Sequence, residues 1–224
     1  MRTLGLVTIG QAPRDDLTPE ILPLMPPCRV VEHGALDGLS ADEVAALAPG
    51  PGEHALTSKL RDGSSAVFGH DQSLPLVEKA VGRAEADGAD VTLIVCSGSF
   101  PPLSHQRPLL FTEALAHHAT AGLAAGDPVG IVRPLPSQVD DGAAAWESTL
   151  GRPVAAATSA SPYTDTLEDV AAAAASLADR CAFIVLDCIG YDEQMRALAA
   201  QASGRHILLV RTLAARLAGE LLVG

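Results

Sequence analysis

Short β-rich segments alternate with longer Ala- and Leu-rich amphipathic segments along the chain, and this rhythm restricts the fold more than any other feature. Parallel strands need long, usually helical connections, so the rhythm predicts an α/β protein with mostly parallel sheets. We expect strands at Thr3–Ile9, Arg29–His33, Val91–Cys96, Pro128–Val132, Pro153–Ala157, Ala182–Asp187 and His206–Val210. We expect helices at Ser73–Asp87, Leu109–Ala121, Val139–Leu150, Leu167–Ala178, Glu193–Ala202 and Leu213–Leu222, with Asp165 and Thr212 as N-caps.

The segment "ALTSKLRDGSSAVFG", from Ala55 to Gly69, interrupts this rhythm. Its Asp62-Gly63 pair stands between two short alternating runs, which is typical of a β-hairpin. Two interpretations of the hairpin stay open. It is either a flap that lies over a ligand site or an edge hairpin that only protects the sheet.

The chain also contains an internal echo, because "LIVCSG" (Leu93–Gly98) and "VLDCIG" (Val185–Gly190) resemble each other. Each is an apolar segment that follows an Ala-rich helical segment, ends in a cysteine and continues into a glycine-containing turn. The echo predicts two pseudo-symmetric α/β halves, residues 1–103 with 207–224 and residues 104–206. Ligands of open parallel sheets bind at the carboxyl ends of the strands, so facing halves would direct Cys96 and Cys188 into one interdomain cleft.

Two opposed thiols suit proton transfer at a carbon atom. A thiolate removes a proton from one face, a thiol returns a proton to the other face, and the stereocentre inverts without a cofactor. A free cysteine has a pKa of about 8.5, so its surroundings must favour the thiolate. We expect the backbone N–H groups of the turns after Cys96 and Cys188 to do this. The alternative is that the echo reflects only repeated strand–turn–helix geometry.

The other residues near these cysteines are open to simpler interpretations. Asp187 either tunes Cys188 or is a buried structural carboxylate. Cys28 and Cys181 are expected to be small buried hydrophobic residues.

The groups expected to bind substrate follow the same predicted strand ends. In "TIGQAPRDD", Gly10 permits close backbone approach, and Gln11 and Arg14 offer an amide and a guanidinium to a carboxylate or phosphate. The alternative is a loop in which Arg14 pairs with a neighbouring aspartate. The expected substrate-binding residues are Thr8, Gly10, Gln11, Arg14, Ser97, Gly98, Ser99, Ile189, Gly190 and, ranked lower than Arg14, Arg133.

The charge of the chain restricts its partners. The net charge is −12 and the sequence pI is about 4.8, so nucleic acids and anionic membranes are repelled and we expect neither as a partner. A small carboxylate-bearing molecule remains compatible, because single arginines and helix N-termini bind anions.

The opening "MRTLGLVTIG" lacks the features of a signal peptide, and no apolar run is long enough to span a bilayer. We therefore expect a cytoplasmic protein with reduced cysteines.

The motifs predict neither a metal nor a cofactor. The cysteine spacing matches no zinc pattern, and the chain lacks GxGxxG, P-loop and GxSxG motifs. His117 and His118 are expected on the solvent side of a helix.

Three stretches, "LVTIGQAPR", "VLDCIGY" and "TLAARLAGELL", resemble the AroM family over essentially the whole chain. That family is similar to the aspartate/glutamate racemase superfamily, which includes racemases, maleate isomerases and arylmalonate decarboxylases. The resemblance implies two pseudo-symmetric Rossmann-like halves, an interdomain site, no cofactor, one catalytic cysteine from each half at Cys96 and Cys188, and homodimers as a common assembly. The turns here are Cys-Ser-Gly and Cys-Ile-Gly, where racemases of the superfamily often have Cys-Asn-Thr and Cys-Thr-His, and this difference argues against glutamate or aspartate as the substrate.

The sequence therefore favours a cofactor-independent racemase or epimerase that acts next to a carboxylate or carbonyl. The same-fold alternative is an isomerase or decarboxylase that uses Cys188 alone. A small-molecule binding or regulatory protein without turnover is the alternative from another class. A thiol redox sensor ranks last. A disulfide needs the two Cα atoms within about 7 Å of each other, and the opposite walls of a substrate cleft should hold them further apart.

Overall fold

The computed structural model describes residues 1–223. The chain forms two compact units, Met1–Glu113 with Ala214–Gly224 and Ala114–Leu213. It passes from one unit to the other inside helix α4 (Thr112–Ala124) and returns inside helix α8 (Val210–Gly219). The boundaries inferred from the sequence, at residues 103–104 and 206–207, stay a prediction.

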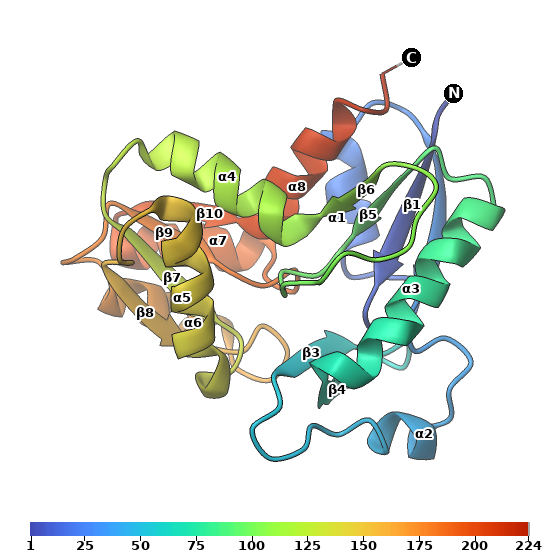
Figure 1. Ribbon diagram of the computed structural model, residues 1–224. Helices are drawn as coiled ribbons and strands as arrows, with labels where there is room; N and C mark the ends of the chain where they lie inside the picture. The colour runs from blue at the N-terminus through green and yellow to red at the C-terminus, as the bar shows by residue number, and fades with distance from the viewer. Residues whose placement is uncertain (224) are drawn as a thin grey trace. The chain divides into compact units, whose positions relative to one another are not determined.

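The first unit is built on a parallel four-stranded sheet of order β2-β1-β5-β6. Its strands are β1 (Thr3–Thr8), β2 (Arg29–Gly34), β5 (Val91–Ile94) and β6 (Leu109–Phe111). Helix α3 (His70–Ala86) packs on β1 and β2 (Figure 1). Its Val77, Ala80 and Val81 are fully buried. The short elements are α1 (Thr18–Ile21), the 3₁₀ turn η1 (Leu22–Leu24) and α2 (Ala41–Ala45).

The expected hairpin is confirmed. Strands β3 (Ala55–Lys59) and β4 (Ser65–Gly69) pair antiparallel, and Gly63 in the turn has a φ of 87°, a conformation that glycine adopts without strain. Phe68 is fully buried and belongs to the core of the first unit. The hairpin is therefore anchored in that core, on the same unit as β1.

The second unit has a parallel sheet of order β10-β9-β7-β8. Its strands are β7 (Val129–Arg133), β8 (Ala156–Ser159), β9 (Phe183–Leu186) and β10 (His206–Leu209), and its further helical elements are η2 (Pro136–Gln138), α5 (Val139–Leu150), α6 (Leu167–Ser176) and α7 (Glu193–Ser203). The core contains the fully buried side chains of Ile131, Trp146 and Val185. Trp146 is thus the largest side chain in a mostly aliphatic cluster, against which Phe183 also packs.

The two sheets share one topology. In each sheet the strand that comes first in sequence, β1 or β7, lies between the second and the third, and the fourth lies outside the third. Strand β5 therefore corresponds to β9, and each is followed within two residues by a candidate catalytic cysteine. The α/β class with parallel sheets and the internal repeat are confirmed, whereas the interdomain cleft stays a prediction.

The structure differs from the sequence-based expectations at three local points. Leu109–Phe111 is strand β6 rather than the first turn of a helix, since it pairs with β5. The N-cap of α6 is Thr166 rather than Asp165, because Thr166 and Asp169 form a capping box. Thr212 lies inside α8, where its hydroxyl donates to the carbonyl of Leu209.

Candidate functional site

Cys96 lies just beyond the carboxyl end of β5 and is buried. The backbone N–H of Gly98 donates to its Sγ atom at 3.3 Å. Ser97 is buried, whereas the exposed Ser99 donates its hydroxyl to the carboxylate of Glu113. The turn thus brings a thiol, an amide and two hydroxyl-bearing residues to one sheet edge.

His70, the first residue of α3, supports this turn from the side. Its Nε2 atom lies 2.8 Å from the carbonyl oxygen of Ser99, and its Nδ1 atom lies 2.8 Å from the carboxylate of Asp71. Its ring also packs against Phe100, with centroids 5.8 Å apart. His70 is not among the site residues expected from the sequence, and its signal there is its place directly after the hairpin.

Cys188 occupies the corresponding place beyond β9 and makes the same kind of amide contact. The backbone N–H of Gly190 lies 3.5 Å from its Sγ atom, so both cysteines contact the amide two residues further along the chain. The hydroxyl of Tyr163, from the loop after β8, lies 3.6 Å from the same sulfur atom. Tyr163 is absent from the sequence-based site, and its only sequence signal is a place just past a predicted strand.

The thiol form of Cys188 is favoured. Burial raises the pKa of Cys188, the nearby carboxylate of Asp187 adds to this effect, and the Gly190 amide, the Tyr163 hydroxyl and the Arg133 charge oppose it without cancelling it. The Gly190 amide thus favours the thiolate, as expected from the sequence, but burial outweighs it and holds the pKa of Cys188 above its ordinary value.

Asp187 is a fully buried carboxylate that ties strand ends together. Its Oδ2 atom accepts hydrogen bonds from Arg133 Nη1 at 2.6 Å and from the indole N–H of Trp146 at 2.7 Å. Because Arg133 ends β7 and Asp187 follows β9, the ion pair joins two neighbouring strands at their carboxyl ends. The structure thus gives Arg133, expected to bind substrate, a carboxylate partner within its own unit.

His117 stacks on Trp146, with ring centroids 3.7 Å apart. The expectation that it faces solvent is wrong, because it is buried, whereas the adjacent His118 is exposed. Burial lowers the pKa of His117 to about 4, so the ring is neutral at physiological pH.

Arg14 is buried beside the carboxyl end of β1. It forms a two-pronged ion pair with Asp16, with Nε–Oδ1 and Nη2–Oδ2 distances of 2.7 and 2.8 Å. Its Nη1 atom donates to Thr8 Oγ1 at 3.1 Å and to Ser58 Oγ, on the hairpin, at 3.4 Å. The fork of Arg14 therefore holds the β1 end and the hairpin together.

The hairpin also lies close against Gly10. A Cβ atom at Gly10 would lie 2.5 Å from the carbonyl oxygen of Lys59 and from Ser58 Oγ. The close approach expected at Gly10 is thus made by the protein's own backbone.

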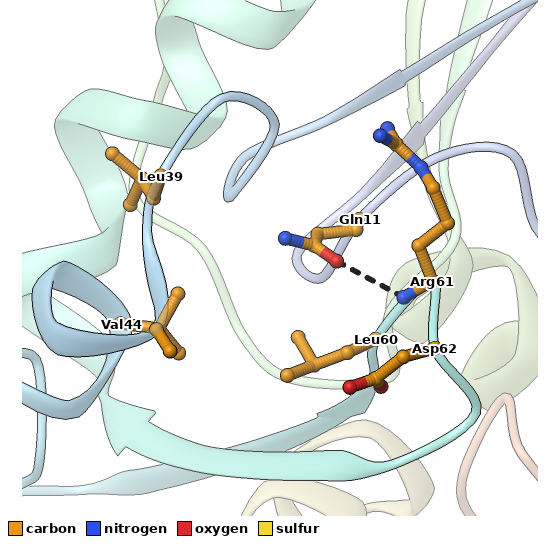
Figure 2. A pocket seen from close by; sticks show the side chains of 7 residues that line it. Gln11, Leu39, Val44, Leu60, Arg61 and Asp62 are labelled. Atoms are coloured by element: carbon orange, nitrogen blue, oxygen red, sulfur yellow. Dashed lines mark hydrogen bonds between the residues drawn. The ribbon is translucent and has the colours of Figure 1, made fainter.

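Gln11 lines a pocket of about 360 Å³ between α2 and the hairpin turn. Figure 2 shows its side-chain oxygen accepting a hydrogen bond from the backbone N–H of Arg61, at 3.0 Å, beside Leu39, Val44 and Leu60. The Gln11 amide also donates weakly to the carbonyl of Leu36 at 3.4 Å. The pocket is largely apolar, and no cysteine lines it.

The expected site residues therefore gather on two sheet edges. On the first unit the edge carries Thr8, Gly10, Arg14, Cys96, Ser97, Gly98 and Ser99, and on the second it carries Arg133, Cys188, Ile189 and Gly190. Gln11 points its amide towards the hairpin turn.

Within residues 1–223 no group of three or more His, Cys, Asp or Glu side chains is arranged to hold a metal ion. Across the same range, every helix is too short or too polar for a membrane span.

Several solved structures share this fold at low sequence identity. Glutamate racemase from Aquifex pyrophilus is 12% identical, with a TM-score of 0.61 and coverage of 99% of this chain and 84% of that one. Maleate isomerase Iso from Pseudomonas putida S16 is 11% identical, with a TM-score of 0.63 and coverage of 99% of this chain and 92% of that one. A liganded double mutant of arylmalonate decarboxylase is 13% identical, with a TM-score of 0.63 and coverage of 100% of this chain and 93% of that one. The fold is thus one that racemases, an isomerase and a decarboxylase use.

Sequence comparison identifies the family itself. Among curated proteins none matches this sequence significantly. The family model described as AroM protein matches residues 4–222. The chain therefore belongs to the AroM family.

Proposed function

We propose that this protein is a cofactor-independent racemase or epimerase in which Cys96 and Cys188 exchange a proton with a carbon next to a carboxylate or carbonyl. The observation that carries the proposal is the equivalence of the two thiols. Each follows the third strand of a sheet with the same strand order, and each has its Sγ atom against the N–H of the glycine two residues on. The reaction requires one substrate to lie between the two sulfur atoms.

The raised pKa of Cys188 suggests that this thiol starts the reaction as the proton donor. The thiolate of Cys96 removes the proton from the substrate carbon, and the electron pair of that C–H bond moves into the adjacent carbonyl as an enolate. The S–H of Cys188 then protonates the opposite face, which leaves Cys188 as the thiolate. This form acts on the opposite enantiomer, or it regains the starting state when Cys188 takes up a proton from water and Cys96 releases one, so protons and electrons balance over the cycle. The raised pKa of Cys188, caused mainly by burial, suits this thiol to the role of acid in the first half-reaction.

Backbone and hydroxyl groups are suited to hold the substrate anion. In this proposal Ser97, Ser99 and the amides of the two glycine turns, which follow the thiols along the chain, stabilise the charge that develops on the enolate oxygen. Arg14 and Arg133 already have Asp16 and Asp187 as partners. In this proposal they fix the strand ends, and the substrate is a small carboxylate-bearing molecule.

One observation also favours a decarboxylase or isomerase that uses Cys188 alone. A buried, protonated thiol is the acid that a one-sided reaction needs to deliver a proton to a single face of an enediolate. Cys96 would then be dispensable, which separates the two functions by mutation.

Hydrogen–deuterium exchange tests both functions. The protein is incubated in D₂O with amino acids, hydantoins, 2-substituted malonates and maleate, and loss of the Cα–H signal, CO₂ release and isomerisation are followed by NMR. A racemase loses inversion in both Cys96→Ser and Cys188→Ser, by about 10³-fold or more, since acid–base groups contribute about 10²–10⁴-fold each.

The matched control is Cys181→Ser, because Cys181 is buried near the opposite, amino end of β9. This variant is expected to retain full activity. Loss of turnover only in Cys188→Ser would instead identify the one-cysteine reaction. No reaction with any substrate class would contradict the enzyme and leave a binding protein on this fold.

A further inference from the structure

The turn after Cys188 has no side-chain hydroxyl, since Ile189 and Gly190 follow the cysteine. A hydroxyl nevertheless reaches this thiol from another segment. The half-buried Tyr163, which follows β8, places its Oη atom 3.6 Å from Cys188 Sγ. Because β8 and β9 both flank β7, their carboxyl ends lie at the same sheet edge.

The loop that carries Tyr163 is held in place by its own hydrogen bonds. The backbone N–H of Tyr163 donates to Ser161 Oγ at 3.2 Å, and the N–H of Ser161 donates to Asp165 Oδ2 at 2.7 Å. The buried hydroxyl of Tyr191 donates to the carbonyl of Ala160 at 2.5 Å, which joins the base of this loop to the turn after Cys188. The phenol ring is therefore positioned by the fold.

Gly190 and the Tyr163 ring fit each other. A Cβ atom at Gly190 would lie 2.6 Å from both Cζ and Oη of Tyr163. Any side chain at position 190 would therefore clash with the tip of the ring, and we expect the resulting shift to break the contact between the hydroxyl and Cys188. The glycine in the Cys-Ile-Gly turn makes room for the tyrosine.

We propose that Tyr163 is a positioning residue whose hydroxyl donates a hydrogen bond to the thiolate of Cys188 once that cysteine has given up its proton. The inference rests on the proposed function and extends it to a third side chain at the site. While Cys188 is a thiol, either atom can be the donor; a thiolate has no hydrogen, so only the phenol can then donate.

The other groups around Cys188 make such a donor useful. Arg133 and the Gly190 amide favour the anion, whereas burial and the carboxylate of Asp187 disfavour it. Tyr191 is also close, but its hydroxyl donates to a backbone carbonyl. Tyr163 is thus the neighbouring side chain that can strengthen its hydrogen bond as the sulfur gains charge.

Titration of the wild-type protein and of Tyr163→Phe, followed by the ¹³Cβ shifts of labelled cysteines, tests the proposal without needing turnover. Cys188 is assigned with Cys188→Ser, and Cys181 serves as the reference in the same spectra. A hydrogen bond to a thiolate stabilises the charged form and lowers its pKa by about one unit or more. The Cys188 midpoint is therefore expected to rise by about one pH unit in Tyr163→Phe. The Cys181 midpoint is expected to stay unchanged.

Gly190→Ala gives a second, independent variant that keeps the hydroxyl and pushes the ring tip away. It is expected to raise the Cys188 midpoint in the same direction, and to add little when combined with Tyr163→Phe, because both changes remove one contact. An unchanged midpoint in Tyr163→Phe, or full additivity in the double variant, would overturn the proposal.

The two proposals fail in distinguishable ways. A raised midpoint without any exchange activity would support the Tyr163 contact and contradict the racemase. Exchange activity with an unchanged Cys188 midpoint would support the racemase and contradict the role of Tyr163.

Discussion

The partly buried Arg133 and the fully buried Asp187 form an ion pair, 2.6 Å between Nη1 and Oδ2, and Asp187 directly precedes Cys188. Asp187 also accepts from the indole of Trp146, which stacks on His117. A continuous chain of contacts therefore runs from the core of the second unit to the residue before the thiol. Packing in this core and the charge beside Cys188 depend on the same carboxylate.

Replacing that carboxylate is expected to destabilise the protein. Asp187→Asn keeps the size of the side chain but removes the negative charge that faces Arg133. Removing one partner of a buried pair costs about 3–5 kcal/mol, so the free energy of unfolding in urea is expected to fall by about 3 kcal/mol. The matched control is Glu193→Gln, which breaks the exposed Arg196–Glu193 pair on α7 and is expected to change stability by less than about 1 kcal/mol. Equal effects of the two changes would contradict this assignment.

Asp16 is expected to give a pH-dependent contribution to stability. Burial alone raises the pKa of Asp16, but the hydrogen bonds and charge of Arg14 outweigh burial, so the folded-state pKa lies below the ordinary 3.8. Stabilisation is therefore complete above that ordinary value and is lost as the pH falls through the folded-state pKa. The urea midpoint of Asp16→Asn should lie below that of the wild type at pH 7 and approach it near pH 3. The exposed neighbour is the control, and Asp15→Asn should show a much smaller difference at both pH values.

His117 should make the protein less stable in mild acid. Its pKa is about 4 when folded and 6.5 in the unfolded chain, so only the unfolded state takes up the proton between these values. Stability therefore rises with pH across this window, and this one group accounts for about 2 kcal/mol between pH 5 and pH 7. His117→Phe, which keeps an aromatic ring on Trp146, should lose that part of the pH dependence. His118→Phe, at an exposed position, should retain it; a wild-type slope in both variants would show that His117 is not the responsible group.

Gly10 is expected to tolerate no side chain. In Gly10→Ala the new Cβ atom would meet the backbone carbonyl of Lys59 at 2.5 Å, so the hairpin must shift, and overpacking of this kind costs about 1–3 kcal/mol. Gly82→Ala is the matched control, because Gly82 lies in α3 with open space around its Cβ position, and it should stabilise the protein by about 0.5–1 kcal/mol. Thermal unfolding that moves in the same direction for both variants would contradict the close approach at Gly10.

The sequence predicted the architecture because repeated local patterns encode it. All seven expected strands and all six expected helices have counterparts in the structure, and the helix Val139–Leu150 matches at both ends. The similarity between the Cys96 and Cys188 segments predicted an internal repeat, which the shared strand order confirms. Strand β6 was missed because a three-residue apolar strand that runs straight into α4 has the same pattern as a helix start.

The partners of the site residues depend on contacts that no local pattern records. The sequence by itself determined the α/β class, the hairpin and the two equivalent cysteines, since hydrophobic periodicity, turn residues and repeats are properties of neighbouring positions. The pairing of Arg14 with Asp16 was one of two interpretations open from the sequence, and the structure decided between them. Only the tertiary structure brought Arg133 to Asp187 and Tyr163 to Cys188. The physical reason is that burial and strand order set these partners and the protonation of Cys188, because both bring together groups from separate strand ends and exclude water from around them.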